Sequence, residues 1–190
     1  MLGTITRNRR ACATIAALAV AVVVVGRPAA SAADEPRTYM PVRDGLAMGL
    51  DPGVALRSMP GAMPVYIRLD LRIGGCLTRW LLLGADWRGD FISTLTPNAP
   101  NTIMELGPVI GFFPWKGLFT RIFVHVAALE PFGAAAGGQL GYEFGIDRFT
   151  AAGFALGGDY DVRFDGQTGW SAGITLFLSA YDLLERFGRD

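Results

Sequence analysis

The stretch AAAGGQLGYEFGIDRFTAAGFALGGDYDVRFDGQTGWSAGITLFLSAY, residues Ala134 to Tyr181, decides the fold. It contains three runs in which apolar side chains alternate with small or polar ones. The apolar sets are Ala134, Ala136, Leu140, Tyr142 and Phe144; Ala152, Phe154, Leu156, Tyr160 and Val162; and Trp170, Ala172, Ile174, Leu176 and Leu178. A period of two over this length predicts β-strands with one apolar and one polar face. The connections Gly145–Arg148 and Phe164–Gln167 are short enough for hairpins, so the three strands form an antiparallel meander.

Alternation alone leaves open which face of the sheet is the inside. A soluble lipocalin-like barrel hides its apolar face, whereas a transmembrane barrel exposes that face to lipid. The polar faces here are mostly Gly, Ala and Ser with an occasional charge, and Lys116 is the only lysine in the sequence. Such faces suit a crowded lumen and make a poor solvent surface, which is normally rich in Lys and Glu. The pattern therefore favours a transmembrane barrel, with a secreted lipocalin-like binding barrel as the alternative.

The first 33 residues have the features of an export signal. Arg7, Arg9 and Arg10 precede an uncharged core, Ala11–Val25, and small residues around Ala30–Ala33 supply a cleavage site. The core is shorter than the roughly 20 residues that cross a bilayer, which argues against the alternative of an uncleaved anchor. We therefore expect a signal peptide over 1–33, a periplasmic lead-in over 34–41, a barrel domain over 42–181 and a short periplasmic tail over 182–190.

Charge and cysteine content restrict the mature chain further. The whole sequence has 17 basic and 17 acidic residues; the leader carries four Arg and no acid, which leaves 13 against 17. This net negative charge gives no reason to expect a nucleic-acid partner. Cys76 is the only cysteine after the leader, so an intrachain disulfide is excluded.

Alternation elsewhere brings the expected number of strands to eight. The expected ranges are Gly45–Asp51, Met63–Ile73, Leu77–Arg88, Thr102–Phe113, Leu118–Val126, Ala134–Phe144, Ala151–Arg163 and Trp170–Ser179. Gly74-Gly75 is predicted to form a tight turn, and Pro108 a bulge or weak point in its strand. The long connections, Asp51–Ala62 and Gly89–Asn101, are expected to be outer loops, although Val54–Leu56 also suits a strand extension. Phe91, Ile92 and Leu95 of the second loop offer an apolar contact surface.

The last strand also contains a recognisable signal. Ser171, Gly173, Leu176 and Leu178 resemble the polar-x-Gly-x-x-apolar-x-apolar signal that the barrel assembly machinery reads in outer-membrane proteins. The usual terminal aromatic residue is replaced here by nine residues after Tyr181. With the strand pattern, the chain resembles the small eight-stranded outer-membrane β-barrels of the OmpA-barrel and OmpX-like class. The resemblance implies an all-β, eight-stranded antiparallel up-and-down transmembrane β-barrel, a monomer in the bacterial outer membrane, whose partners are outer-membrane lipids and the assembly machinery.

The polar face is predicted to fill the lumen with paired charges. Its members, with the one histidine, are Arg68, Asp70, Arg72, Asp86, Arg88, Glu105, Arg121, His125, Glu143, Asp159, Asp161 and Arg163. An eight-stranded barrel is just filled by side chains, and buried charges need partners. Since the charges nearly balance and come from many strands, we favour a structural network over a binding site or a proton pathway.

Catalysis is the second functional class. Lipid A deacylases of the outer membrane use a histidine with a serine two residues further on, and here His125 is followed at that position by Ala127. One histidine and one cysteine after the leader give no basis for a metal or a cofactor. We therefore expect no catalytic role, with a lipid-modifying barrel enzyme as the alternative.

Aromatic residues are expected to mark the two membrane interfaces. The candidates are Trp80, Trp87, Trp115, Tyr142, Tyr160 and Trp170, although strand propensity alone also favours aromatics. The sequence identifies no external ligand. The function it favours is a structural outer-membrane barrel, with the display of binding loops outside the cell as an additional role left open.

Overall fold

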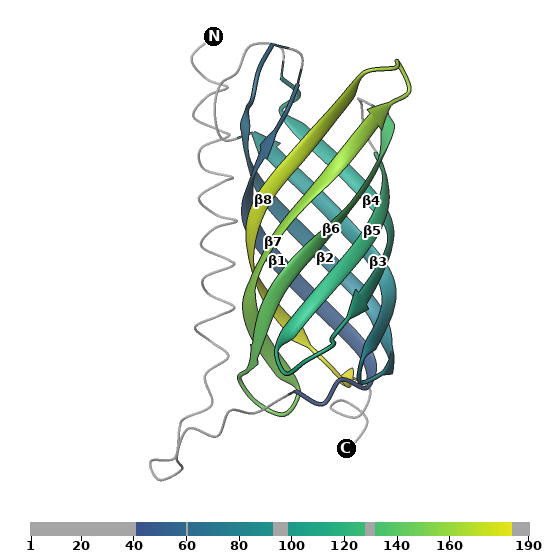
Figure 1. Cartoon of the computed structure of the whole chain (residues 1–190), viewed down its shortest axis with the longest axis vertical. Coiled ribbons are helices and arrows are strands. Elements are labelled where there is room, and N and C mark those ends of the chain that lie inside the picture. The colour runs from purple at the N-terminus through teal and green to yellow at the C-terminus, as the bar shows by residue number, and fades with distance from the viewer. Residues whose placement is uncertain (1–40, 60, 93–98, 128–131, 184–190) are drawn as a thin grey trace, which may run out of the picture. The chain divides into compact units, whose positions relative to one another are not determined.

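A computed structural model describes residues 41–59, 61–92, 99–127 and 132–183. Eight strands close into a single antiparallel barrel in sequence order, and β8 pairs with β1 (Figure 1). The strands are β1 (Gly45–Arg57), β2 (Val65–Thr78), β3 (Leu81–Ile92), β4 (Thr102–Phe112), β5 (Leu118–Ala127), β6 (Gly133–Gly145), β7 (Thr150–Arg163) and β8 (Thr168–Ala180). The predicted all-β, eight-stranded up-and-down barrel is confirmed. In the described ranges no helix is long and apolar enough to span a membrane.

The strand register sets how strongly the barrel is staggered. The register pairs can be followed from each strand to the next, starting and finishing on β1. The paired residues along this path are Leu46, Gly75, Leu83, Ile110, Ile122, Gly138, Gly158, Ala172 and Leu56. The path thus returns to β1 ten residues beyond its start. For eight strands, a stagger of this size requires tilted strands, in the usual range of about 35–45°, and an interior just wide enough for side chains.

Side chains sort by face as the alternation predicts. On β5, Phe119, Arg121, Phe123 and His125 are buried, whereas Ile122, Val124 and Val126 are exposed. The other strands repeat this pattern, with their charged and small residues inside. The faces follow from the pleat, because successive side chains point to opposite sides of a strand.

The structure corrects the extent of the first strand. The loop predicted from Asp51 to Ala62 begins only after Arg57, because β1 continues through Pro52. The ladder to β2 is continuous there, but the ladder to β8 is interrupted between Leu50 and Gly53. The proline therefore stands where one edge of the strand makes no ladder bond.

Pro108 occupies an equivalent position in β4, as predicted. It pairs with Ala85 of β3, while the ladder to β5 is interrupted between Leu106 and Val109. The weak point expected from the missing donor is thus confirmed.

The predicted turn at Gly74-Gly75 is wrong. Both glycines lie within β2, and the chain turns at Arg79 and Trp80 instead. Gly74 pairs with Gly84 of β3, and a Cβ added to Gly74 would lie 2.9 Å from the Gly84 Cα. Glycine is required here by the close approach of two strands, a role that the sequence pattern does not distinguish from a turn.

The third strand is also displaced from its predicted range. It begins at Leu81 and runs on to Ile92, so the loop predicted over Gly89–Asn101 is shorter than expected. Phe91 and Ile92 belong to the strand, and Ile92 packs against the buried cluster of Met59, Tyr66 and Ile103; Leu95 lies outside the described residues. Arg79 is exposed in the turn between β2 and β3.

The two ends of the barrel differ in their connections. We call the end with the connections 79–80, 113–117 and 146–149 the turn end, and the opposite end the loop end. Val42 donates to the Arg148 carbonyl and Asp182 to the Asp44 carbonyl, so both ends of the described chain lie at the turn end. The predicted signal peptide, most of the lead-in and most of the tail lie outside the described residues.

Candidate functional site: the charged lumen

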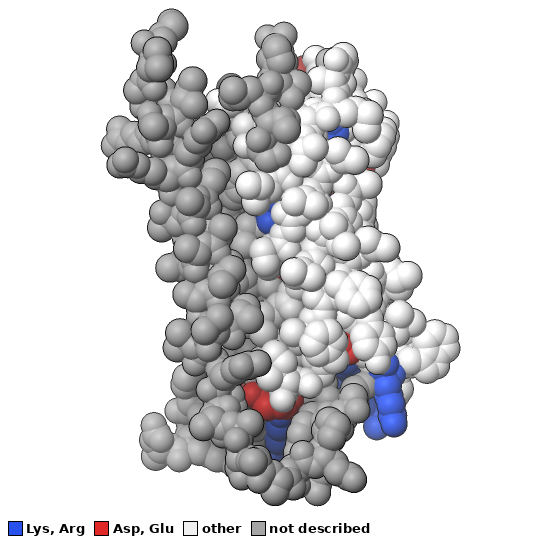
Figure 2. Space-filling model, turned by 90° about the vertical axis from the view of Figure 1, so that its left-hand side faces the viewer, with Lys and Arg blue, Asp and Glu red and all other residues white. Residues whose placement is uncertain are grey.

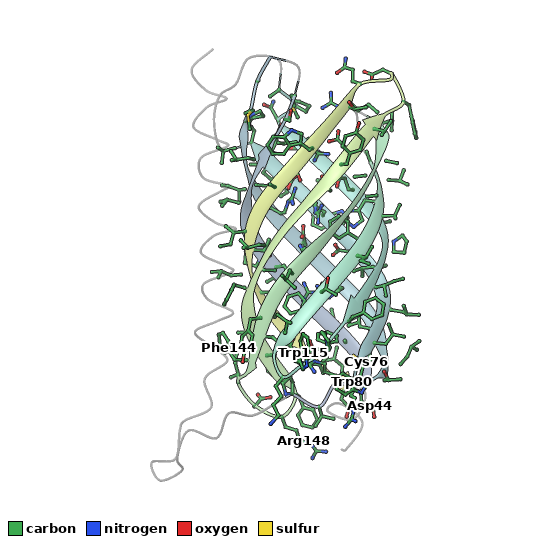
Figure 3. The ribbon with its side chains drawn as sticks, in the orientation of Figure 1. Asp44, Cys76, Trp80, Trp115, Phe144 and Arg148 are labelled. Atoms are coloured by element: carbon green, nitrogen blue, oxygen red, sulfur yellow. The ribbon has the colours of Figure 1, made fainter. Side chains whose placement is uncertain are left out.

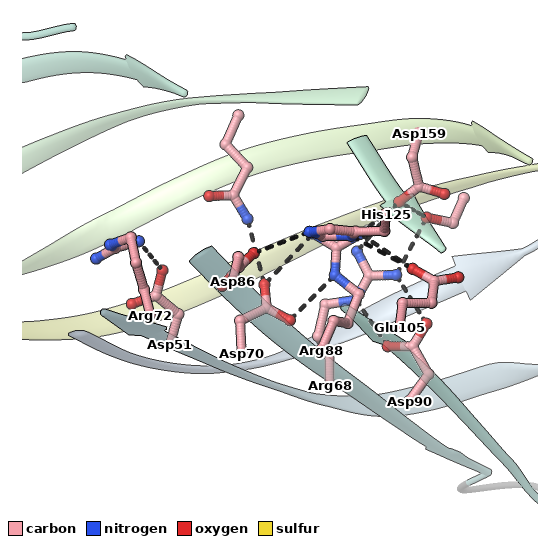
Figure 4. Close-up of polar contacts among 12 residues, drawn as sticks. Asp51, Arg68, Asp70, Arg72, Asp86, Arg88, Asp90, Glu105, His125 and Asp159 are labelled. Carbon is pink, nitrogen blue, oxygen red and sulfur yellow. Dashed lines mark hydrogen bonds and ion pairs between the residues drawn. The ribbon is translucent and has the colours of Figure 1, made fainter. Parts of the chain in front are cut away.

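The lumen holds an unusual density of buried charge (Figure 4). Five arginines and eight acids are almost completely buried: Arg57, Arg68, Arg72, Arg88, Arg121, Asp51, Asp70, Asp86, Asp90, Glu105, Glu143, Asp159 and Asp161. They come from seven of the eight strands, β1 to β7, and each stands at an inward position of the pleat. Charges removed from water in this way are tolerated only when they are paired.

Asp51 joins two arginines towards the turn end. Its Oδ2 accepts from Arg72 at 3.1 Å and from Arg121 at 2.5 Å. The Arg121 guanidinium lies 4.2 Å from the centroid of the Phe119 ring, and Arg72 also donates to Ser179 at 3.2 Å. This group connects the charged region to the apolar layer next to it.

Arg88 occupies the middle of the lumen. Its Nε donates to Asp70 at 3.1 Å and its Nη1 to Asp159 at 2.8 Å. Ser171 donates to the same Asp159 oxygen at 2.7 Å, and the Arg88 guanidinium lies 4.4 Å from the Phe123 ring centroid. One arginine thus ties β3 to β2 and β7 across the barrel.

A second arginine cluster lies nearer the loop end. Arg68 donates to both oxygens of Asp90, at 2.7 and 2.8 Å, and Arg57 donates to Asp90 at 3.2 Å and to Glu105 at 2.7 Å. Asp90 therefore receives three charge-assisted bonds, an arrangement that offsets the cost of burying it, whereas Glu105 receives one.

His125 lies between two carboxylates. Its Nε2 is 3.4 Å from Asp86 and its Nδ1 is 3.6 Å from Glu105, while its ring stacks on Phe123 with centroids 4.6 Å apart. Neither ring nitrogen makes a hydrogen bond among the described residues, and the two contacts are ion pairs when the imidazole is protonated. The half-buried Arg43 and Arg163 bring the arginines to seven, so among the described residues a charged His125 balances the eight buried acids.

Glu143 anchors the segment before β1 to the end of β8. Arg43 donates to Glu143 Oε1 through its Nε at 2.6 Å and also through its Nη2, and the Tyr181 hydroxyl donates to Oε2 at 2.8 Å. Burial, followed by the neighbouring Glu143 carboxylate, raises the pKa of Tyr181 above its usual value. The tie joins β6 to the segments that precede β1 and follow β8.

Apolar layers bound the charged region at both ends. At the turn end the buried layer is Ala47, Cys76, Leu82, Phe113, Phe119, Ala151, Ala155, Phe177 and Tyr181. At the loop end Met59, Tyr66 and Ile103 form a smaller cluster. A pocket of about 10 Å³ beside Arg57, Glu105 and Asp161 has room for about one water molecule. Within the described part of the chain the lumen is therefore filled.

The structure places all twelve predicted lumen residues on the inward face, with Arg163 half-buried near the mouth. Four charged members of the network were missed: Arg43, Asp51, Arg57 and Asp90. Arg57 and Asp90 were missed because they fell in predicted loops. The alternation of inward and outward residues continues past Pro52 and Gly89, and this pattern could have placed both residues in strands. Asp51 was on the inward face of its predicted strand but was not included among the paired charges.

The other predicted residues lie on the outside or in β8. Trp115, Tyr142, Tyr160 and Trp170 are exposed, with Trp115 and Tyr142 near the turn end. Trp87 is half-buried and pairs with Leu71 and Leu106, well inside the strands. Ser171 and Gly173 point inwards from β8, and Leu176 and Leu178 point outwards.

The lumen contains no recognisable catalytic pair among the residues that the structure describes. The charged contacts of His125 are with carboxylates, and Ser171, Ser179 and Thr175 bond elsewhere or stand without a hydrogen-bond partner. No group of three or more His, Cys, Asp or Glu suited to a metal occurs in the same residues. The arrangement can hold strands together, and it offers no activated nucleophile.

No protein-family model matches the sequence, and no curated protein matches it. Among solved structures, the barrel is similar to the crystal structure of Neisserial surface protein A (NspA), an eight-stranded outer-membrane β-barrel, with a TM-score of 0.56. The sequences are 11% identical over 72% of this chain and 96% of that one. The likeness shows that this chain has the fold of a small outer-membrane β-barrel.

Proposed function

We propose that the protein is a structural outer-membrane β-barrel with a filled, charge-paired lumen and no catalytic role. The observation that carries this proposal is the distribution of apolar side chains. Each of the eight strands exposes large apolar residues, for example Met48, Ile73, Leu83, Ile110, Ile122, Leu140, Leu156 and Leu176. Figure 2 likewise shows a largely uncharged described surface, with the larger basic patches near its lower end.

Such a surface is stable only in contact with lipid or another apolar partner. Soluble monomers rarely expose continuous apolar patches larger than a few hundred Å². A secreted lipocalin-like barrel of the same topology would turn its apolar face inwards, whereas this lumen contains arginines and carboxylates. An apolar outside with a polar inside is the arrangement of membrane barrels, whose outer band is about 25 Å tall.

The outer membrane is favoured over other membranes by two further features. The first 33 residues have the composition of an export signal, and the fold is shared with NspA. The β8 sequence around Ser171, Gly173, Leu176 and Leu178 supports handling by the barrel assembly machinery. We propose a monomer embedded in outer-membrane lipids, since the closed barrel leaves no sheet edge for pairing with another chain.

The structure of the loop end gives less support to a binding role than the sequence alone gave. Since β1 extends to Arg57 and β3 to Ile92, the two longest loops lose residues to the strands. The paired and filled lumen, with His125 enclosed by carboxylates, also gives little support to a lipid-modifying activity. A structural role in the envelope accounts best for these observations.

The location is tested by expressing the full chain in a Gram-negative host and separating the soluble, inner-membrane and outer-membrane fractions. We expect the protein in the outer-membrane fraction, and we expect unheated samples to migrate differently from boiled samples in a detergent gel. Recovery in the soluble periplasmic fraction would contradict the proposal and favour the lipocalin-like alternative.

A further inference from the structure

Each of the three connections at the turn end carries a basic residue next to an aromatic one. The pairs are Arg79-Trp80, Trp115-Lys116 and Arg148-Phe149. All three basic residues are exposed, as are Trp80 and Trp115 at 46% and 71%. Figure 3 shows the labelled Trp80, Trp115 and Arg148 at the same end of the barrel. Because the connections join alternate strand pairs, the three pairs are distributed around the barrel.

Two of the pairs also make direct contact. The Arg79 guanidinium carbon lies 4.9 Å from the centroid of the Trp80 ring, and that of Arg148 lies 5.2 Å from the Phe149 ring. Cations stack on aromatic faces at such distances while their donors remain available to other partners. The arginines are therefore held near the rings without being neutralised by them.

The opposite end has a different composition. Its connections, residues 58–64, 93–101, 128–132 and 164–167, contain no Lys or Arg, and they contain the acids Glu130 and Asp165. The turn-end connections thus carry three cations and one acid, Asp147, whereas the loop-end connections carry two acids and no cation. This difference gives the two rims opposite tendencies towards an anionic surface.

Asp44 and Asp147, acids near the turn end, bind backbone N–H groups and not these cations. Asp147 Oδ1 accepts from the backbone N–H groups of Phe149 and Thr150, both at 2.7 Å, and Asp44 accepts from the Gly45 N–H at 2.8 Å. Within the described ranges, Arg79, Lys116 and Arg148 form no ion pair. Three exposed cations are thus available to anions from outside the protein.

From these features we propose that Arg79, Lys116 and Arg148 form a ring of phosphate-binding positions for anionic phospholipid headgroups at the turn end. The proposal rests on the proposed membrane location of the barrel. Aromatic rings favour the boundary between hydrocarbon and headgroups, and long basic side chains extend from it to the headgroups. Each cation near an anionic lipid surface strengthens binding by about fivefold. The ring fixes the depth of the barrel and selects the lipids around its turn end.

The test uses the full mature chain, refolded into phosphatidylcholine vesicles that contain increasing amounts of brominated phosphatidylglycerol. Bromine quenches tryptophan emission, so all variants are made in a Trp87→Phe/Trp170→Phe background, where Trp80 and Trp115 report on the lipids at the turn end. We expect the wild type to prefer phosphatidylglycerol and the R79Q/K116Q/R148Q variant to lose at least tenfold of that preference. The R79K/R148K variant retains positive charge and is expected to keep the preference.

Controls separate the possible sources of the effect. Arg163→Gln removes a cation near the loop end and is expected to leave the preference unchanged. Sodium phosphate and sodium chloride at equal ionic strength should weaken the preference equally; stronger competition by phosphate would assign the positions to free phosphate and reject the lipid site. A triple variant that migrates as a folded barrel and keeps the wild-type preference would also reject the proposal.

Failure of this inference is distinguishable from failure of the proposed function. A wild-type protein that inserts into the vesicles but shows no lipid preference contradicts only the phosphate ring. A wild-type protein that inserts into neither neutral nor anionic vesicles contradicts the membrane location, and the ring with it.

Discussion

Arg68 and Asp90 form a two-bond ion pair between neighbouring strands inside the barrel. The Arg68 Nε donates to one Asp90 oxygen at 2.7 Å and its Nη2 to the other at 2.8 Å. The two residues are register partners on β2 and β3, and only 3% and 0% of their surfaces are exposed. The pair therefore forms where the pleat places two inward side chains opposite one another.

Replacement of Arg68 by Ala is expected to lower the free energy of unfolding by about 3–5 kcal/mol, because Asp90 remains buried with fewer partners. Asp70→Ala, which deprives Arg88 of one partner, is expected to have a similar effect. Urea unfolding in detergent micelles, followed by tryptophan fluorescence, measures both.

Two controls belong with this measurement. The double variant R68A/D90A should cost less than the sum of the single changes, because it removes both charges together. Arg163→Ala should cost at most about 1 kcal/mol, since this arginine is half-exposed near the mouth. Additive losses in the double variant would show that the pair contributes nothing as a unit.

The same pair shows what the sequence can predict of the site. The period of two placed Arg68 inside the barrel because the alternation around it is regular. Asp90 was missed because Gly89 suggested a loop, although the strand in fact continues to Ile92. Pairing partners also depend on the stagger of ten residues around the closed barrel, which results from all eight ladders together and is not visible in any one strand.

Glycines inside the strands give a second prediction. Gly74→Ala is expected to destabilise the barrel by about 1–3 kcal/mol, because the new methyl group would lie 2.9 Å from the Gly84 Cα on the neighbouring strand. The measurement is the urea midpoint of the folded form, read from the mobility of unheated samples.

The adjacent residue provides a matched control. A Cβ on Gly75 would have its nearest contact at 3.9 Å, an ordinary packing distance. Gly75→Ala is therefore expected to be neutral or slightly stabilising, by up to about 1 kcal/mol, through the reduced freedom of the unfolded chain. If Gly74→Ala and Gly75→Ala lowered the urea midpoint equally, the close approach of β2 and β3 would not explain why position 74 is a glycine.

This comparison also explains the error in the predicted turn. Gly-Gly is a strong turn signal in a sequence, and nothing near Gly74 shows that another glycine, Gly84, will face it. The contact joins residues whose alignment depends on where the chain turns, and the turn at Arg79-Trp80 has no glycine of its own. Local sequence therefore identified the strand but misplaced its end.

Conductance tests whether the lumen is filled. Planar-bilayer recordings of the wild type are expected to show no steady open pore, because paired charges and two apolar clusters occupy the lumen. Phe119 packs edge-to-face on Phe177 with centroids 5.1 Å apart, so F119A/F177A should raise the frequency of brief openings and lower stability. Large, regular conductance steps from the wild type would instead indicate a channel.

His125 separates a structural barrel from a lipid-modifying enzyme. Its ring nitrogens face Asp86 and Glu105, and its inward neighbours on β5 are Phe123 and Ala127, so no hydroxyl within the described residues is placed for activation. We expect lipid mass spectrometry to give the same acyl pattern in cells with the wild type, with His125→Ala and without the protein. His125→Ala should nevertheless lower the urea midpoint, because two buried carboxylates lose the group between them.

An acyl pattern that changes with the wild type and reverts with His125→Ala, while the variant barrel remains heat-modifiable, would establish a catalytic histidine. A lower midpoint with unchanged lipids is the outcome that a purely structural histidine requires.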